Sequence, residues 1–525
     1  MNYADLFRVT LPETALEVAA LVVLVVDLAF LRKAALKLRV TVAALLGVAG
    51  CGAALWALYT SSGTGFSFGG ALLLAQYGYV GAVQSGILVL TAITLLLLID
   101  ETFTKHIGEF VAVMLMAATG GLLLAAAQDL MVIFIGLELL SLGLYIMTAF
   151  AKSSGKSAEA ALKYYLFGGM SAAFLLFGFS YLYGLSGSTN LSEILGAIAQ
   201  QGPSPLFYVA WILVIAGLGF KVAAVPFHLW APDTYEGAPT PAAAFIASVS
   251  KVASFALLLT ISGTMVMFHR DHNLSISEFE RQIRLFFGTW HSLLDVLLVL
   301  AAISMIVGNL AALAQTSVRR LLAYSAIAHV GYILLGVGTH PQLYPPGTEL
   351  ISVGIGGIID ALLFRQAPVL YYILTYGLTI IGAFGVVSVV ERATGSDKLD
   401  SFLGLHKRNP LLAAVLLVLF LSLAGIPPLV GFWAKFNLFA AVLGVSAGPV
   451  PFALVALAIA MSAVSLYYYL QVLKRAYVMP AIDESPIKAH PVTLAVLLLI
   501  AAAVVVLGCF PALLLRWIES FYLVM

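Results

Sequence analysis

Long apolar runs separated by short polar breaks occupy almost the whole chain. Most runs have about 20 residues, the length that crosses the hydrocarbon core of a bilayer as an α-helix. The pattern therefore predicts an all-α, polytopic membrane protein with about fourteen transmembrane helices. The expected helices cover residues 12–31, 38–60, 79–99, 109–127, 130–150, 157–184, 206–230, 240–268, 292–315, 318–338, 369–391, 409–445, 452–475 and 491–516.

Composition agrees with this pattern and narrows the chemistry. Of the 525 residues, 62% are hydrophobic and 10% are charged, whereas soluble proteins have roughly 25% charged residues. The net charge of +1 gives no support for nucleic-acid binding. Cys51 and Cys509 both lie in apolar runs, and no Cys/His cluster has the spacing of a zinc, haem or iron–sulfur site. We therefore expect no metal or cofactor in this chain.

The lysines and arginines concentrate in alternate polar breaks, which predicts the orientation. If these breaks face the cytoplasm, both termini lie on the other side of the membrane. We therefore expect a multi-pass protein of a bacterial inner membrane with both termini in the periplasm. The polar N-terminus does not resemble a cleaved signal peptide. The segment 269–291 disagrees, because it places three arginines outside, and its sequence SISEFERQIRLFF predicts an amphipathic surface helix. The breaks expected in the cytoplasm are 32–39, 100–108, 151–163, 231–239, 316–320, 392–408 and 474–490.

Four ionisable residues lie where the hydropathy pattern predicts apolar ones: Glu138, Lys221, Lys251 and Lys435. Each costs roughly 2.5–3.5 kcal/mol at a helix centre, so such residues usually line a polar pathway. A buried lysine can exchange its proton when an acidic partner moves or water is admitted. Glu138, as the only buried carboxylate on a comparable helix, is the expected modulator of Lys221. The alternative is that the four form static ion pairs or extend to the membrane surface.

Hydroxyl groups share a helical face with two of these charges, and a similar stripe with an imidazole runs along the tenth expected helix; such groups can hold water and pass protons. The alternative is that they only pack and hydrogen-bond between helices. The residues are Ser141 and Tyr145 after Glu138, Ser248 and Ser254 around Lys251, and His329 between Ser325 and Tyr332.

Two expected helices carry helix-breaking residues next to a buried lysine. Pro226 and Pro232 follow Lys221, and the sequence LAGIPPLVGFWAK precedes and includes Lys435. Interior prolines interrupt the backbone hydrogen bonds, and the freed carbonyls must then be satisfied by protein or water. The sequence therefore predicts that both helices are broken. Prolines that only accommodate packing kinks are the alternative.

Paired interruptions in two halves of a chain are typical of inverted repeats in transporters. We expect an N-terminal part (1–108), a first repeat of helices 4–8 (109–268), a second repeat of helices 9–13 (292–475) and a C-terminal helix (491–525). In this scheme Glu138 corresponds to His329, and Lys221 corresponds to Lys435.

Four segments resemble signatures of the antiporter-like membrane subunits of NADH-quinone oxidoreductase (respiratory complex I). They are GFKVAAVPFHLWAPDTYEGAPTP (219–241), RRLLAYSAIAHVGYILLG (319–336), IFIGLELLSLGLYIM (133–147) and GIPPLVGFWAKFNLF (425–439). Lys435 sets the chain apart from the branch with a glutamate on the twelfth helix. The end of the chain after the fourteenth helix sets it apart from the branch with a long lateral helix.

The resemblance implies a proton-translocating subunit, coupled to electron transfer from NADH to quinone. It implies that Glu138 and Lys221 gate the channel, that Lys251 is the connecting lysine, and that Lys435 leads to the periplasmic exit. Lys163 and His228 match further polar positions of the family. The implied partners are other membrane subunits and a peripheral redox arm, which hold the flavin, the iron–sulfur clusters and the quinone site.

Two other functions stay open at the sequence level. The large subunit of a cation/proton antiporter shares the broken helices and the buried lysines, and sodium-dependent transport would favour it. A quinone-binding redox enzyme could build an apolar pocket from the 11% aromatic residues. Aromatic residues are, however, ordinary at membrane interfaces, and no polar pair specific for a quinone headgroup is visible.

Overall fold

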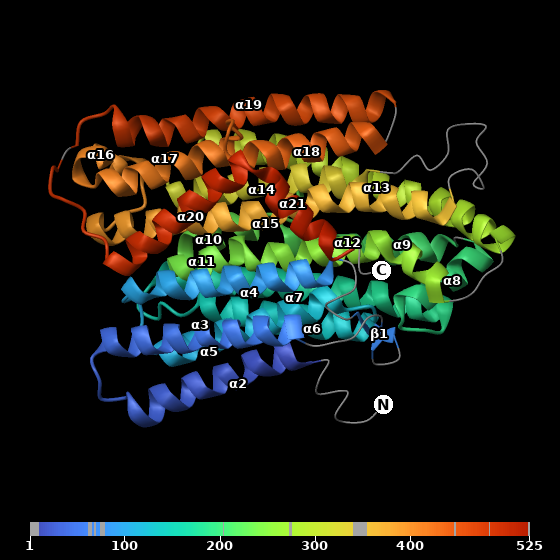
Figure 1. The fold of residues 1–525 in the computed structure, drawn as a ribbon, viewed down its shortest axis with the longest axis horizontal. Helices are drawn as coiled ribbons and strands as arrows, with labels where there is room; N and C mark the ends of the chain where they lie inside the picture. Colours follow the sequence, from blue (N-terminus) through green and yellow to red (C-terminus); the bar gives the residue numbers. More distant parts are fainter. Residues whose placement is uncertain are drawn as a thin grey trace.

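The chain folds as an array of long helices with roughly parallel axes (Figure 1). The computed structural model describes residues 10–60, 66–67, 70–73, 79–202, 204–271, 276–339, 354–445, 448–481 and 483–522. Each of the expected spans falls on helix there. Within the described residues, twelve helices are long and apolar enough to cross a membrane, and α17 and α18 are two shorter apolar helices. The predicted all-α class is confirmed.

The first half of the chain contains the following elements. They are α2 (Leu11–Val25), the π-helical turn η1 (Val26–Phe30), α3 (Leu36–Thr60), β1 (Phe66–Ser67), β2 (Leu72–Leu73), α4 (Val80–Leu97), the 3-10 turn η3 (Leu98–Asp100), α5 (Ile107–Ala126), α6 (Leu130–Thr148), α7 (Gly155–Ser186), α8 (Leu191–Gln201), α9 (Pro205–Val222), α10 (Trp230–Gly237), α11 (Thr240–Ala247) and α12 (Val249–Asp271). Strands β1 and β2 form one short antiparallel pair.

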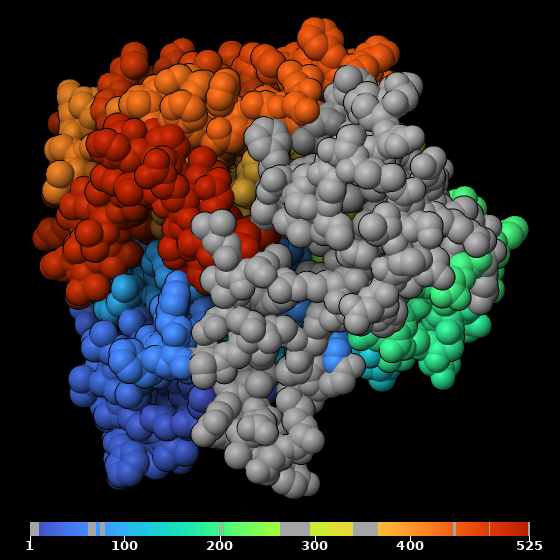
Figure 2. All heavy atoms as spheres, turned by 45° about the vertical axis from the view of Figure 1, so that its right-hand side comes forward, coloured from blue at the N-terminus to red at the C-terminus, as the bar shows by residue number. Residues whose placement is uncertain are grey.

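The second half is helical in all its described elements. They are α13 (Ile276–Leu313), α14 (Val318–Gly338), α15 (Gly354–Thr394), η5 (Leu399–Phe402), α16 (Leu405–Arg408), α17 (Pro410–Ala424), α18 (Val430–Val445), α19 (Pro449–Tyr477), α20 (Pro491–Cys509) and α21 (Pro511–Ser520). The C-terminal helices return to the N-terminal ones, because α20 contacts both α4 and α15. Figure 2 shows this C-terminal segment in red against the blue N-terminal helices.

The polar breaks provide the caps that start the helices. Asp129 accepts the backbone N–H of Met131 at 2.8 Å at the start of α6, and Asn409 accepts that of Leu412 at 3.0 Å at the start of α17. Such caps satisfy N–H groups that have no partner inside the helix. The breaks thus fix where each apolar helix begins.

Contacts between breaks test the expected sides of the membrane. Arg392 pairs with Asp100 at 2.5 Å, and Ser317 hydrogen-bonds Asp397. Arg475 pairs with Asp400 at 3.6 Å. Each contact joins two segments that the lysine and arginine pattern assigns to the same side. The contacts agree with the grouping of the breaks, and which compartment they face stays a prediction.

The structure differs from the expected elements in five places. α8 was not expected, and the helix expected over 240–268 is interrupted at Ser248. α15 begins at Gly354, so that part of the loop expected over 339–368 is helix; residues 340–353 lie outside the described residues. The amphipathic helix expected over 269–291 is, from Ile276, the first part of α13. Pro511 divides the last expected helix into α20 and α21, because proline cannot continue the hydrogen-bond ladder.

Candidate functional site

The structure brings Lys221 close to Glu138. Lys221 lies in the last turn of α9 and Glu138 in the middle of α6, and the Lys221 Nζ atom is 3.6 Å from Glu138 Oε1. The same ammonium donates a 2.7 Å hydrogen bond to Ser141 Oγ. At 3.6 Å the two charges attract without a direct hydrogen bond. The expected pairing is therefore present, with a serine hydroxyl as the direct partner of the lysine.

The expected burial of Glu138 is wrong in one respect. Its side chain is 25% exposed, whereas that of Lys221 is 7% exposed. The expectation that it is the only buried carboxylate is also wrong, because Asp27 is 1% exposed and pairs with Arg39 at 2.6 Å. The helical period shows which residues share a face of the helix. It does not show whether that face points into the chain or away from it, because both kinds of face are apolar in a membrane protein.

Lys251 contacts the first broken helix. It lies in the first turn of α12, is 4% exposed, and donates from Nζ to the carbonyl oxygen of Val222 at 3.2 Å. Val222 is the last residue of α9. The last carbonyls of a helix have no partner within it and carry partial negative charge, so an ammonium stabilises them. Lys251 therefore caps the C-terminus of α9.

Lys435 makes the same contact at the second break. Its Nζ donates to the carbonyl oxygens of Leu423 and Ala424 at 3.3 and 3.0 Å and to Ser462 Oγ at 2.7 Å. Leu423 and Ala424 end α17. The ammonium also lies over the ring of Tyr332, 5.1 Å from its centroid, an attractive cation–π arrangement.

The backbone has the same succession of conformations at both breaks. Ala223 and Gly425 have positive φ angles of 62° and 89°, and each ends a helix. The cis peptide bonds Val225–Pro226 and Pro427–Pro428 follow them. The predicted interruptions are confirmed.

Two details of the expected breaks change. Pro232 does not take part in the first break, because it lies in the first turn of α10, where no N–H is needed. Lys221 precedes its break, whereas Lys435 follows the other one. Lys251 and Lys435 each donate to carbonyls at the C-terminus of a broken helix. In this contact Lys251, and not Lys221, corresponds to Lys435.

A network of aromatic hydroxyls surrounds His329 on α14. His329 Nδ1 is 2.8 Å from Tyr372 Oη, and Nε2 is 3.5 Å from Tyr469 Oη; Tyr469 also bonds Ser325. The expected stripe of Ser325, His329 and Tyr332 is therefore part of a hydrogen-bonded network, and the ring of Tyr332 lies under the ammonium of Lys435.

Sequence reasoning missed several residues of this network. Asn309 donates from Nδ2 to Tyr332 Oη at 3.1 Å and accepts from Tyr468 Oη at 3.1 Å. Ser462 is the hydroxyl partner of Lys435. Asn309 carries a polar amide side chain inside an expected span. This polarity is the sequence signal by which it could have been found.

A small cavity connects His329 to the second break. Its walls include Tyr372, Tyr376, Ser422 and Gly431, and about 10 Å³ is open to the centre of a water molecule. That volume is sufficient for about one water. A water there would lie between the imidazole and the broken helix.

Gly431 is required by the close approach of α17 and α18. A Cβ atom at this position would overlap the carbonyl oxygen of Ser422, and the Gly431 N–H donates to Ser422 Oγ at 3.2 Å. We expect Gly431→Ala to lower the stability in detergent by about 1–3 kcal/mol, as overpacking does. Thermal unfolding measures this. Gly169→Ala on α7, with open space around its Cβ, is the control, and equal stability of both variants would contradict the prediction.

Lys163 and His228 lie elsewhere. Lys163 pairs with Asp233 on α10 at 2.7 Å, and Arg320 on α14 pairs with the same carboxylate at 2.7 Å. Lys163 thus anchors α10. His228 lies in the break after α9, 8% exposed, and its Nδ1 has no hydrogen-bond partner among the described residues.

The paired bases also act on Asp233. Partial burial alone would raise its pKa, but the hydrogen bonds from Lys163 and Arg320 outweigh this and lower the pKa below its usual value. A lowered folded-state pKa contributes stability above the usual value of about 4, which is lost as the pH falls further. We expect Asp233→Asn to destabilise the protein by about 1 kcal/mol at pH 7, after solvent screening, and by less at pH 3.5. Thermal unfolding at both pH values tests this, and an equal loss at both would contradict it.

Comparison with known proteins identifies the family. The family model described as NADH:quinone oxidoreductase/Mrp antiporter, TM, matches residues 127–345 and 347–462. NADH-quinone oxidoreductase subunit N 2 of Acidobacterium capsulatum is 46% identical over 99% of both chains. Subunit N 1 of Roseiflexus castenholzii is 39% identical over 85% of this chain and 78% of its own.

Solved structures give the same result. A chain of respiratory complex I from Thermus thermophilus is 32% identical, covers 96% of this chain and 98% of its own, and superposes with a TM-score of 0.73. A chain of the Mrp complex from Dietzia sp. is 19% identical over 99% and 97%, with a TM-score of 0.73, and shares the fold. The chain therefore belongs to the NADH:quinone oxidoreductase/Mrp antiporter family, within its subunit N group.

Proposed function

We propose that this chain is a proton-translocating membrane subunit of an NADH-quinone oxidoreductase. Three buried lysines, each with a hydroxyl or carbonyl partner, support this proposal most directly. The partners are the other membrane subunits and the peripheral arm, whose flavin, iron–sulfur clusters and quinone site carry out the electron transfer. This chain moves protons in response.

The proton path runs through Lys221, Lys251, the His329 network and Lys435. Lys221 keeps its proton while Glu138 is close and releases it when that charge is withdrawn, because a nearby carboxylate favours the ammonium. Lys251 and Lys435 are favoured as ammonium ions by the helix ends they cap. Movement of either break changes that preference, so the breaks couple structure to protonation.

Glu138 is placed to respond to a neighbouring subunit. It lies in a stripe of exposed apolar residues along α6, formed by Met131, Ile135, Leu142 and Ile146. A carboxylate facing lipid would be costly, whereas one facing another subunit can meet a charge there. We infer that this face of α6 is an interface within the complex, through which redox-driven changes reach Lys221.

We further propose an orientation and an internal repeat. The basic breaks face the cytoplasm, so protons enter near the ends of α10 and α11 and leave toward the periplasm, where both termini lie. The paired breaks, in each of which a helix ends at a residue with positive φ and a proline follows, support two inverted repeats, over 109–268 and 292–475. The inner membrane is the location that this function requires.

Purification of the tagged protein in mild detergent, followed by mass spectrometry of its companions, tests the proposal. We expect flavin- and iron–sulfur-bearing subunits to co-purify. Recovery with small membrane subunits only would instead indicate a cation/proton antiporter. In that case, proteoliposomes should show sodium- or potassium-dependent proton exchange, which we do not expect here.

A further inference from the structure

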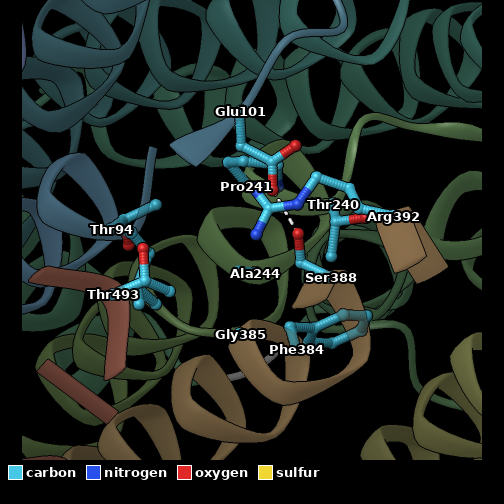
Figure 3. Close-up of a pocket in the computed structure, with 11 residues that line it drawn as sticks. Thr94, Glu101, Thr240, Pro241, Ala244, Phe384, Gly385, Ser388, Arg392 and Thr493 are labelled. Carbon is cyan, nitrogen blue, oxygen red and sulfur yellow. Dashed lines mark hydrogen bonds and ion pairs between the residues drawn. The ribbon is translucent and has the colours of Figure 1, made fainter. Parts of the chain in front are cut away.

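A second polar cluster lies away from the lysines, at the end of the array where α4 and α15 end. It surrounds a cavity between α4, α11, α15 and α20, shown in Figure 3. About 10 Å³ of this cavity is open to the centre of a water molecule, which is space for about one water. Its polar lining consists of Thr94, Glu101, Thr240, Ser388, Arg392 and Thr493.

Glu101 is the acidic group of this cavity. It is 8% exposed, accepts a hydrogen bond from Ser388, and has its Oε1 atom 3.6 Å from Arg392 Nη1. Figure 3 shows Glu101 and Ser388 facing one another beside Arg392. Arg392 pairs more closely with Asp100, at 2.5 Å. One guanidinium therefore serves two carboxylates, and Glu101 is only partly neutralised.

The surroundings allow Glu101 to bind and release a proton. Burial raises its pKa; Arg392 and Ser388 lower it, and the carboxylates of Glu391 and Asp100 raise it again. Arg392 and Asp100 are about a quarter exposed, so the outer edge of the cluster reaches the surface of the chain. A buried carboxyl at the edge of a surface cluster can exchange protons with solvent.

Thr493 brings a hydroxyl without a partner among the described residues to this cavity. It is 2% exposed, and its Oγ1 has no hydrogen-bond partner among the described residues. The neighbouring Thr94 hydroxyl donates to Leu90 O at 2.8 Å within its own helix. Buried hydroxyls nearly always have a partner. A water bound in the cavity would supply one for Thr493.

The cavity lies at the head of the helix that leads to Lys251. Thr240 and Ala244 line it on α11, and Ser248, one turn further, donates to Ala244 O at 2.7 Å. The span Thr240–Ser262 is entirely buried. Lys251 is eleven residues beyond Thr240, about 16 Å along a helix. Ser248 lies between them at the interruption of this helix.

We propose that the Glu101 cavity collects protons for this subunit and delivers them toward Lys251. Glu101 takes a proton from the solvent side onto its carboxylate. It then releases the proton to the cavity water, which restores the carboxylate, and the proton passes along Ser248. This inference rests on the proposed proton translocation and adds the group that takes up the proton.

Proton pumping by the intact complex in inverted membrane vesicles tests this assignment. Glu101→Gln keeps an acceptor for Ser388 and Arg392 but cannot carry a proton. We expect its initial rate of proton uptake, and its ratio of protons to electrons, to fall about tenfold, with normal assembly on native gels. Thr493→Val, which removes the hydroxyl at nearly constant size, should lower both about threefold. Pumping at the wild-type ratio in both variants would overturn the proposal.

A matched control separates this function from a general effect of charge removal. Glu193 also accepts a hydrogen bond from a serine, Ser188, at 2.5 Å, but its own side chain is exposed on α8. Glu193→Gln should pump as the wild type does. If Glu101→Gln fails to assemble, the pumping rate of Thr493→Val tests the proposal in its place. Lys251→Met tests the proposed function itself, since wild-type pumping there would contradict proton translocation through the lysines, whatever Glu101 does.

Discussion

Replacing Lys221 by methionine will lower proton pumping at least about tenfold, because methionine fills the same space and carries no proton. Coupled electron transfer should also fall, but by less, so that the ratio of protons to electrons decreases. The measurement is proton uptake and NADH oxidation in the same inverted vesicles. The proton-to-electron ratio separates loss of pumping from loss of enzyme.

The same variant should also be less stable. It leaves the Glu138 carboxylate without the ammonium 3.6 Å away, and no other base of the described residues pairs with it. Removing one partner of a partly buried ion pair is destabilising. Adding Glu138→Gln should therefore restore the stability of Lys221→Met and leave pumping low. Restored stability in the double variant would show that Lys221 and Glu138 are energetically coupled, because the effects of independent residues would simply add.

Two outcomes would contradict the role assigned to this pair. One is a wild-type proton-to-electron ratio in the Glu138→Ala, Lys221→Ala double variant. The other is recovery of pumping together with stability in the Glu138→Gln, Lys221→Met variant. The second outcome would show that Lys221 only neutralises Glu138. Ser141→Ala, which removes only the 2.7 Å hydroxyl partner, is the milder comparison.

Lys435→Glu is expected to be the more damaging of two substitutions at the second break. Lys435 donates to two carbonyls at the C-terminus of α17, where partial negative charge gathers. A carboxylate there removes the donors and adds repulsion of up to about 2 kcal/mol. Lys435→Gln keeps amide donors and no charge. We therefore expect stability to fall from wild type to glutamine to glutamate, while both variants lose pumping.

Thermal unfolding of the purified complex and pumping in vesicles check this order. Ser462→Ala removes the third partner of Lys435 and leaves both carbonyl contacts, so its effect should be smaller. A Lys435→Glu variant as stable as the wild type would contradict the capping role. Pumping retained in Lys435→Gln would show that Lys435 supports the break without carrying protons.

The sequence by itself determined the class of protein, the helical segments and the two broken helices. The solvent explains this: in a bilayer every backbone polar group must be satisfied within its own segment, so an apolar run of sufficient length becomes a helix wherever it packs. Prolines act equally locally, through one missing donor and one fixed angle. The costly charges Glu138, Lys221, Lys251 and Lys435 also stand out locally.

Features without a local signal were missed. Ser248 interrupts its helix with no proline or glycine at that position. The start of α15 at Gly354 follows a segment whose polar and apolar residues resemble a loop. At Ser248 the surroundings decide, because the described residues from Thr240 to Ser262 are all buried; a one-dimensional pattern cannot represent such packing.

Only the tertiary structure decided which groups meet. Ser141 and Lys221 are 80 residues apart in the chain, and Glu101 and Ser388 are 287 apart. Hydropathy shows that Lys251 and Lys435 are buried but not that each caps a broken helix. It gives no indication that Glu138 lies on an outer face. Those facts depend on how helices from distant parts of the chain turn toward one another, and that arrangement is set by close packing of side chains across their interfaces.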